Sequence, residues 1–221
     1  MKLLMPKEAE VRLEQSGIVA VLVIDNPDDA PALAKTLLAS GIRAMELTLR
    51  TDSAIESLKR IRREVPEMYA GVGTILTKEQ LIMAKESEAA FGVAPGYNRE
   101  VVRLALDLDF PFAPGIATPS EIEAAVSQGC HILKFFHAEG MGGIEYLKGI
   151  NSPYQHLGLR YIPLGGLSLG NMQSYLALKE ILAIGGSWIA PRELIQKRDW
   201  EKIAKNGKEA VAVLKQVRGK A

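Results

Sequence analysis

The sequence predicts an α/β fold, a (β/α)₈ TIM barrel with one additional helix at its N-terminus. Short apolar segments alternate with longer segments of helical periodicity about eight times along the chain, which is the pattern of this barrel. The length of 221 residues is close to the roughly 200–250 residues in which such barrels are built. No linker and no shift in composition interrupts the alternation, so residues 1–221 are predicted to form a single domain.

The predicted strands are short apolar runs bounded by glycine, proline or polar residues. They cover residues 18–24, 44–49, 70–74, 90–94, 111–114, 132–136, 159–163 and 181–184. The helices predicted after them cover residues 28–40, 53–64, 78–86, 99–107, 119–127, 144–150, 169–176 and 199–217. Thr51 and Asp52 are suitable N-caps for the second of these helices. Residues 7–15 precede the first strand, and we expect them to form the extra helix and to close the bottom of the barrel.

An open, doubly wound sheet is the alternative arrangement of alternating strands and helices. Such sheets often carry a G-x-G-x-x-G turn after the first strand, and none occurs here. The barrel is therefore the favoured prediction.

The composition excludes several classes of function. The 27 Lys and Arg residues balance 26 Asp and Glu residues, and no basic block occurs, so we expect no nucleic-acid partner. No apolar run reaches the roughly 18 residues of a membrane helix, and the opening segment alternates charged and apolar residues instead of forming a signal-peptide core. The single cysteine, Cys130, cannot form an internal disulfide. We therefore expect a cytoplasmic protein with a small-molecule partner and no membrane association.

Glu46 is the first candidate site residue. In a strand over residues 44–50, Met45 and Leu47 lie on one face, and Glu46 and Arg50 lie on the other. The apolar face suits the outer helices, so the carboxylate points into the barrel, where burial is costly without a task or a partner. An ion pair with Arg50 is the alternative role, although about 13 Å separates the two Cα atoms at ~3.3 Å per residue.

Lys134 is the second candidate, because it interrupts an apolar strand from Ile132 to Phe136. Apolar surroundings disfavour the ammonium form and favour the free amine, which can attack a carbonyl carbon. A lysine that reaches solvent at the strand end, or that only pairs with Glu46, is the alternative. A neighbouring acid would also serve the proton transfers around an imine, so pairing and catalysis are compatible.

Two glycine pairs follow the last two predicted strands, Gly165-Gly166 and Gly185-Gly186, and Ser187 comes directly after the second pair. Glycine lets backbone N–H groups approach an anion closely, and the loops after strands seven and eight of many barrels hold a phosphate. Two pairs in succession therefore indicate a phosphorylated ligand, whereas either alone would indicate only a tight turn. The three histidines, His131, His137 and His156, lack metal-ligand spacing, so we expect no metal.

Taken together, these motifs resemble the bacterial 2-keto-3-deoxy-6-phosphogluconate (KDPG) aldolases, which include the 4-hydroxy-2-oxoglutarate (KHG) aldolases. The resemblance covers nearly the whole chain, and E-x-T-L-R-T and K-F-F are its most specific parts. The matching segments are Met45 to Thr51, Gly71 to Thr74, Ala94 to Gly96, Lys134 to Phe136, Gly165-Gly166 and Gly185 to Trp188.

The resemblance implies a class I aldolase, usually a homotrimer, in which Lys134 forms the Schiff base and Glu46 is the general acid and base. It implies reversible cleavage of KDPG, or of its galactonate epimer, to pyruvate and glyceraldehyde 3-phosphate, with no metal or organic cofactor, as in the Entner–Doudoroff pathway of carbohydrate metabolism. The other positions that match the substrate-binding residues of the family are Arg50, Thr74 and Pro95 at the pyruvate carboxylate, Phe136 on the pocket wall, and Gly165, Gly166 and Ser187 at the phosphate.

The sequence departs from the family pattern at two positions. His137 replaces the proline of K-F-F-P-A-E, and Leu164 replaces the threonine before the paired glycines. Both changes concern the aldehyde half of the substrate and leave the residues of the imine chemistry unchanged. KHG is therefore an alternative substrate. A phosphosugar isomerase or synthase barrel with Glu46 as its base, and a phosphate-binding barrel without catalysis, are the alternatives outside this family.

Overall fold

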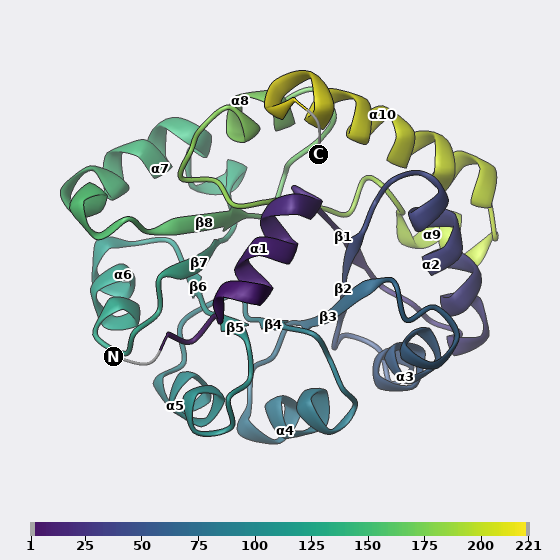
Figure 1. The fold of residues 1–221 in the computed structure, drawn as a ribbon, viewed down its shortest axis with the longest axis horizontal. Helices are drawn as coiled ribbons and strands as arrows, with labels where there is room; N and C mark the ends of the chain where they lie inside the picture. Colours follow the sequence, from purple (N-terminus) through teal and green to yellow (C-terminus); the bar gives the residue numbers. More distant parts are fainter. Residues whose placement is uncertain (1–2, 220–221) are drawn as a thin grey trace.

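The computed structural model describes residues 3–219, which form a ring of parallel strands surrounded by helices (Figure 1). One sheet has the strand order β5-β4-β3-β2-β1-β9, and a second has the order β6-β7-β8. The strands are β1 (Ile18–Leu22), β2 (Ala44–Thr48), β3 (Tyr69–Gly73), β4 (Gly92–Val93), β5 (Phe112–Ala113), β6 (Gly115–Ile116), β7 (Ile132–Phe135), β8 (Arg160–Pro163) and β9 (Ile184–Gly186).

The two sheets join into a closed barrel at two seams. At the first, Pro114 separates β5 from β6, and its carbonyl accepts a hydrogen bond from the Lys134 N–H at 2.9 Å. Proline has no N–H to donate, so the barrel strand is interrupted at Pro114 and resumes as β6, beyond the predicted range of 111–114. At the second seam, a parallel bridge joins Tyr161 to Ile181. The nine strands assigned within residues 3–219 thus make eight barrel strands, because β5 and β6 are one, and the predicted barrel is confirmed.

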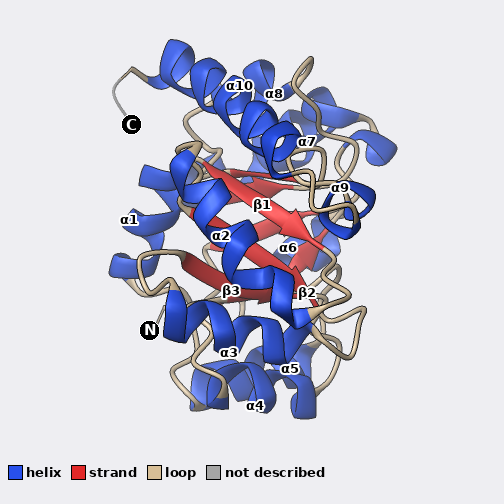
Figure 2. Cartoon of the chain, turned by 90° about the vertical axis from the view of Figure 1, so that its right-hand side faces the viewer, coloured by secondary structure: helices blue, strands red, loops and turns tan. Residues whose placement is uncertain are grey.

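The helices lie on the outside of the barrel (Figures 1 and 2). The helices after the first strand are α2 (Ala30–Ala39), α3 (Ala54–Glu64), α4 (Lys78–Glu86), α5 (Arg99–Asp107), α6 (Pro119–Val126), α7 (Gly143–Asn151), α8 (Met172–Leu176), α9 (Arg192–Gln196) and α10 (Trp200–Arg218), with 3₁₀ turns η1 (Pro27–Asp29), η2 (Glu139–Met141) and η3 (Ser152–Leu157). Thr77 and Thr118 begin α4 and α6 with capping boxes, which satisfy N–H groups that have no partner inside the helix. No described helix is long and apolar enough to cross a membrane.

The N-terminal helix α1 (Lys7–Ser16) covers the end of the barrel at which the strands begin, opposite the tips of the strand arrows in Figure 2. Its residues Ala9 and Leu13 join the cluster that fills the barrel interior with Val19 and Ile162. The helix ends at Gly17, whose left-handed backbone (φ 62°) lets its N–H bond to the Leu13 carbonyl. The predicted extra helix therefore closes the bottom of the barrel.

Candidate active site

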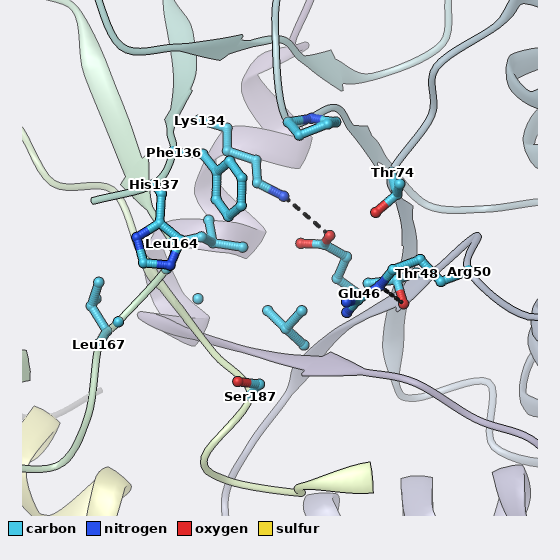
Figure 3. A pocket seen from close by; sticks show the side chains of 15 residues that line it. Glu46, Thr48, Arg50, Thr74, Lys134, Phe136, His137, Leu164, Leu167 and Ser187 are labelled. Atoms are coloured by element: carbon cyan, nitrogen blue, oxygen red, sulfur yellow. Dashed lines mark hydrogen bonds and ion pairs between the residues drawn. The ribbon is translucent and has the colours of Figure 1, made fainter. Parts of the chain in front are cut away.

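A cavity of about 450 Å³ opens at the C-terminal ends of the barrel strands, the end at which barrel enzymes carry their active sites. All of the candidate residues from the sequence line it: Glu46, Arg50, Thr74, Pro95, Lys134, Phe136, Gly165, Gly166 and Ser187. Three further lining residues, His137, Leu164 and Gly185, were noted in the sequence as departures from the family pattern or as part of a glycine pair, whereas Val21, Thr48 and Leu167 were given no site role. Figure 3 shows most of these side chains around the cavity.

Lys134 and Glu46 form the centre of the cavity, where their side chains point toward one another (Figure 3). The Lys134 Nζ lies 3.3 Å from the Glu46 Oε1, and the two side chains are only 5% and 2% exposed. Lys134 comes from β7 and Glu46 from β2, so the fold joins residues that are 88 positions apart in the chain. The Lys134 Nζ also lies 5.4 Å from the centre of the Phe136 ring. A buried amine in contact with one carboxylate and one aromatic face is available to a ligand only from the cavity side.

Gly73 on β3 makes room for the Glu46 side chain. A Cβ atom at Gly73 would lie 1.6 Å from the Glu46 Oε1, which is far inside van der Waals contact. β2 and β3 pair in parallel, with Thr48 opposite Gly73. The sequence analysis missed this role. The two glycines of Gly71-Val72-Gly73 are nevertheless a signal, because a glycine within a strand can mark a site where another group approaches the backbone closely.

The alternative pairing of Glu46 with Arg50 is not observed. The Arg50 Nε donates instead to the Thr48 Oγ1 at 3.2 Å, and that hydroxyl donates to the Leu22 carbonyl at 2.9 Å. Arg50 is exposed at the cavity mouth and forms no ion pair with any of residues 3–219. Its guanidinium thus retains donors for an anionic ligand.

Thr74 lies on the same side of the cavity as Arg50 (Figure 3). Its backbone has a φ of 62°, a left-handed conformation that is uncommon for a β-branched residue. Strained backbone of this kind concentrates at binding and catalytic positions. Among the described non-glycine residues with a positive φ, Thr74 is the one that lines the cavity.

Gly165 and Gly166 form a turn with backbone N–H groups that have no partner within the described chain. Both have positive φ values, 99° and 76°. The Gly165 carbonyl accepts a hydrogen bond from the Glu139 N–H at 3.0 Å, and the Gly166 carbonyl accepts one from the Asn171 side chain at 3.2 Å. With the carbonyls occupied and the N–H groups unpaired, the turn is suited to bind an anion. Ser187 lines the same cavity and is exposed.

The described residues hold no group of three or more His, Cys, Asp and Glu side chains arranged for a metal ion. His131 lies away from the cavity, near the start of β7, with its Nε2 3.6 Å from the Glu10 carboxylate of α1. Burial lowers the pKa of His131, and Glu10 opposes that shift. His156 is exposed on η3, so His137 is the histidine that lines the cavity.

Comparison with known proteins identifies the family. The family model described as KDPG and KHG aldolase matches residues 9–206. The chain belongs to the KDPG and KHG aldolase family. A 2-dehydro-3-deoxy-phosphogluconate aldolase of Haemophilus influenzae is 39% identical over 204 residues, which cover 92% of this chain and 95% of that relative.

Solved aldolases of this family share the fold. The KDPG aldolase of Legionella pneumophila, with pyruvate captured at low pH as a covalent carbinolamine intermediate, has a TM-score of 0.87 and 33% identity, covering 91% of this chain and 97% of that chain. The KDPG aldolase of Zymomonas mobilis, with 3-phosphoglycerate, has a TM-score of 0.85 and 33% identity, covering 92% of this chain and 95% of that chain.

The cavity of this aldolase has three chemically distinct parts. A buried amine and a carboxylate occupy the centre, a guanidinium lies at one end, and unpaired N–H groups lie at the other. Arg50 and Thr74 are on one wall and His137 and Leu167 are on the opposite wall, with Ser187 between them at the lower edge of the view (Figure 3). This arrangement suits a ligand with a carbonyl in its middle and an anionic group at each end.

Proposed function

We propose that this aldolase cleaves KDPG to pyruvate and glyceraldehyde 3-phosphate through an imine on Lys134. The observation that carries the proposal is the buried Lys134 amine, 3.3 Å from the Glu46 carboxylate in a cavity with anion-binding groups at both ends. The reaction runs in both directions, and the proposed site requires neither a metal nor an organic cofactor.

The covalent steps follow from the position of the amine. The Lys134 Nζ in its free-base form attacks the C2 carbonyl of the keto acid to give a carbinolamine, which loses water to form a protonated imine. When the C3–C4 bond breaks, its electron pair moves into the imine, so an enamine forms instead of a bare carbanion. The aldehyde leaves as glyceraldehyde 3-phosphate, the enamine gains a proton at C3, and water releases pyruvate from the lysine.

Glu46 moves the protons in this scheme. Cleavage requires a base to take the proton of the C4 hydroxyl, and the formation and loss of the carbinolamine require a proton donor and acceptor beside Nζ. The Glu46 carboxylate is in contact with Nζ and is buried, and the only ion pair that it makes among the described residues is with Lys134. The proposal therefore assigns both proton transfers to Glu46, with water as the relay to C4.

The groups at the two ends of the cavity indicate which end of the substrate each of them binds. We assign the pyruvate carboxylate to Arg50, Thr74 and Pro95, because a guanidinium binds a carboxylate through two parallel hydrogen bonds. We assign the phosphate to the N–H groups of Gly165 and Gly166 and to the Ser187 hydroxyl. The Zymomonas mobilis relative was solved with 3-phosphoglycerate, which also carries a carboxylate and a phosphate.

Leu164 widens the substrate class. Its buried, apolar side chain offers no hydrogen bond to the C4 hydroxyl, so the cavity separates the gluconate and galactonate epimers by shape alone. The proposal therefore covers both epimers of the phosphorylated keto acid. KHG is the second candidate, and it shares every step on Lys134.

Trapping with borohydride tests the covalent step. Incubation with pyruvate and borohydride should reduce the imine and add the mass of one pyruvate adduct to the peptide that holds Lys134. Lys134→Met should abolish both labelling and cleavage, whereas Lys59→Met, at an exposed position on α3, should retain both. Labelling of another lysine, or cleavage by Lys134→Met, would contradict the assignment of the imine to Lys134, whereas no labelling of the wild type would favour an isomerase or a binding barrel. Values of kcat/KM for KDPG, its galactonate epimer and KHG then rank the substrates.

We also propose a homotrimer in the cytoplasm that serves the Entner–Doudoroff pathway, as the family resemblance implies. Leu76, just before α4, is 50% exposed, and Met83, within α4, is 43% exposed. These apolar side chains are available for contact with a second copy of the chain. Cys130 is buried and free, and burial raises its pKa to about 12, which disfavours the thiolate. Light scattering on the purified protein measures the assembly state.

A further inference from the structure

His137 stands at the mouth of the cavity, where the family pattern has proline. It follows β7 directly, so it is three positions beyond Lys134, and its side chain is exposed. Figure 3 shows its ring on the wall opposite Arg50 and Thr74, at the end of the cavity that holds the glycine turn. The reaction scheme above gives this imidazole no role.

The hydrogen bond that the His137 Nδ1 accepts assigns the tautomer of the neutral ring. The Gly140 N–H donates to the His137 Nδ1 at 3.1 Å. A ring nitrogen that accepts a hydrogen bond carries no proton, so the neutral ring holds its proton on Nε2. Nε2 has no hydrogen-bond partner among residues 3–219, which leaves one N–H donor unused.

The unused donor lies against the glycine turn. A Cβ atom at Gly165 would lie 2.6 Å from the His137 Cδ2 and 3.0 Å from its Nε2. The Cγ–Cδ2 side of the ring therefore lies closest to Gly165, with Nε2 next along the ring. His137 and both glycines, whose N–H groups are unpaired within the described chain, line the same cavity.

The ring and the turn are held in place together. The Glu139 N–H donates to the Gly165 carbonyl at 3.0 Å, and the Met141 N–H donates to the His137 carbonyl at 2.9 Å. The Phe136 ring meets the imidazole edge to face, at 5.3 Å between ring centres. A donor that is fixed before the ligand arrives loses little conformational entropy on binding.

We propose that His137 is a specificity residue that donates its Nε2 proton to the phosphate of the substrate, beside the N–H groups of Gly165 and Gly166. The inference rests on the proposed function, because it assigns one further contact to the phosphate end of the same ligand. A proline at this position has no such donor, so the contact belongs to this chain and not to the family pattern.

Two substitutions distinguish the loss of the hydrogen-bond donor from the loss of the structural contacts of the ring. In His137→Asn, the side-chain oxygen takes the place of Nδ1 and still accepts from Gly140. The side-chain NH₂ group takes the place of Cδ2, one bond short of Nε2, so no donor reaches the position of the Nε2 proton. In His137→Gln, the longer side chain brings an N–H group to the place of Nε2. His156→Asn changes an exposed histidine on η3 and is the matched control.

The measurement is the ratio of kcat/KM for KDPG to kcat/KM for 2-keto-3-deoxygluconate, which has the same carbon chain without the phosphate. We expect His137→Asn to lower this ratio roughly 10- to 100-fold, mainly through KM for KDPG, as for the loss of a hydrogen bond to a charged group. His137→Gln should retain most of the ratio, and His156→Asn should retain all of it. An unchanged ratio in His137→Asn overturns the inference, whether both rates fall together or neither falls. An equal loss in His137→Gln overturns it as well.

Two further measurements distinguish failure of this inference from failure of the proposed function. Pyruvate labelling of Lys134 should be the same in wild type and in His137→Asn, because pyruvate has no phosphate. If pyruvate does not label the wild type, the proposed function is wrong. If the wild type is labelled but the kcat/KM ratio is unchanged in His137→Asn, only the proposed role of His137 is wrong. Long-range ¹H–¹⁵N spectra of the wild type should show the proton on Nε2, and a proton on Nδ1 at neutral pH would contradict the assignment.

Discussion

At the scale of single residues, the site depends on groups that the sequence predicted one by one, on a Glu46–Lys134 pairing that it offered as one alternative, and on a close approach at Gly73 that it did not predict. Glu46 and Lys134 each stood out as a charge within an apolar strand, and that signal is local. Their contact at 3.3 Å is not local, because only the closed barrel joins β2 to β7 across its interior. Gly73 was not predicted because its role is to be small beside Glu46, and a glycine in a strand can equally mark a bulge or a tight bend.

Gly73→Ala tests the space that Glu46 occupies. The new Cβ atom would overlap the Glu46 carboxylate, so the carboxylate must leave its place beside Lys134. We expect kcat for KDPG cleavage to fall by about 10²–10⁴-fold, the range for the loss of a general acid and base, and Glu46→Gln should fall in the same range. Labelling by pyruvate and borohydride should slow but persist to a measurable extent in both variants, because Lys134 remains.

Gly149→Ala is the matched control for this substitution. Gly149 lies within α7, and a Cβ atom there would have no neighbour within 4 Å, so we expect wild-type kcat. Melting temperatures show whether each variant is folded. A folded Gly73→Ala enzyme with wild-type kcat would contradict the assignment of Glu46.

At the scale of elements, periodicity predicted most strands and helices, and the differences have local causes. The strand predicted over 111–114 is interrupted at Pro114, which has no N–H, and continues to Ile116 as β6. The predicted helix over 169–176 begins only at Met172. The Asn171 side chain accepts from the Ser168 N–H and donates to the Gly166 carbonyl, so it holds the preceding residues in a loop. Helix α9 was missed because five residues are too few for a periodic pattern.

Helix α1 supplies a prediction about stability. Leu13 is completely buried and joins the cluster in the barrel interior, at the end opposite the cavity. Leu13→Ala should lower the free energy of unfolding by about 2–5 kcal/mol, through lost apolar burial and the space left behind. Values of kcat/KM at a temperature where both proteins are folded should remain unchanged, because α1 does not contact the cavity. Leu3→Ala, at a residue that is 51% exposed, is the control, and an equal change of stability in both variants would contradict this role of α1.

At the scale of the whole molecule, ion pairs join the first part of the chain to the last at both ends of the barrel. Near the bottom, the Arg160 Nη2 of β8 lies 2.6 Å from the Glu14 Oε1 of α1. Near the cavity end, the Arg192 Nε of α9 donates to Asp25, after β1, at 2.9 Å. The first and last strands, β1 and β9, pair directly, and the Asp25–Arg192 pair joins the segments that follow them. The Glu14–Arg160 pair instead holds α1 against the bottom of the barrel at β8.

The two carboxylates share a direction of pKa shift. The hydrogen bond from Arg160 lowers the pKa of Glu14 below its ordinary value of 4.5, although partial burial opposes the shift. Hydrogen bonds from Arg192 and Gln196 lower the pKa of Asp25 below 3.8 in the same way. A carboxyl with a lower pKa in the folded state binds its proton more weakly there than in the unfolded chain. Its contribution to stability is therefore present above the unfolded pKa and is lost as the pH falls through the folded value.

Glu14→Gln tests this linkage. At pH 7 the variant should lose up to about 1 kcal/mol of the free energy of unfolding, a small effect because the Glu14 side chain is 45% exposed. Below pH 4.5 the difference between wild type and variant should shrink as the wild-type carboxyl binds a proton, and it should vanish below the folded pKa. Urea unfolding at a series of pH values measures the difference, with Glu86→Gln at an exposed position on α4 as the control. A difference that stays constant from pH 7 down to the acid limit would show that the Glu14 side chain stabilises α1 through packing alone, because packing does not depend on the charge.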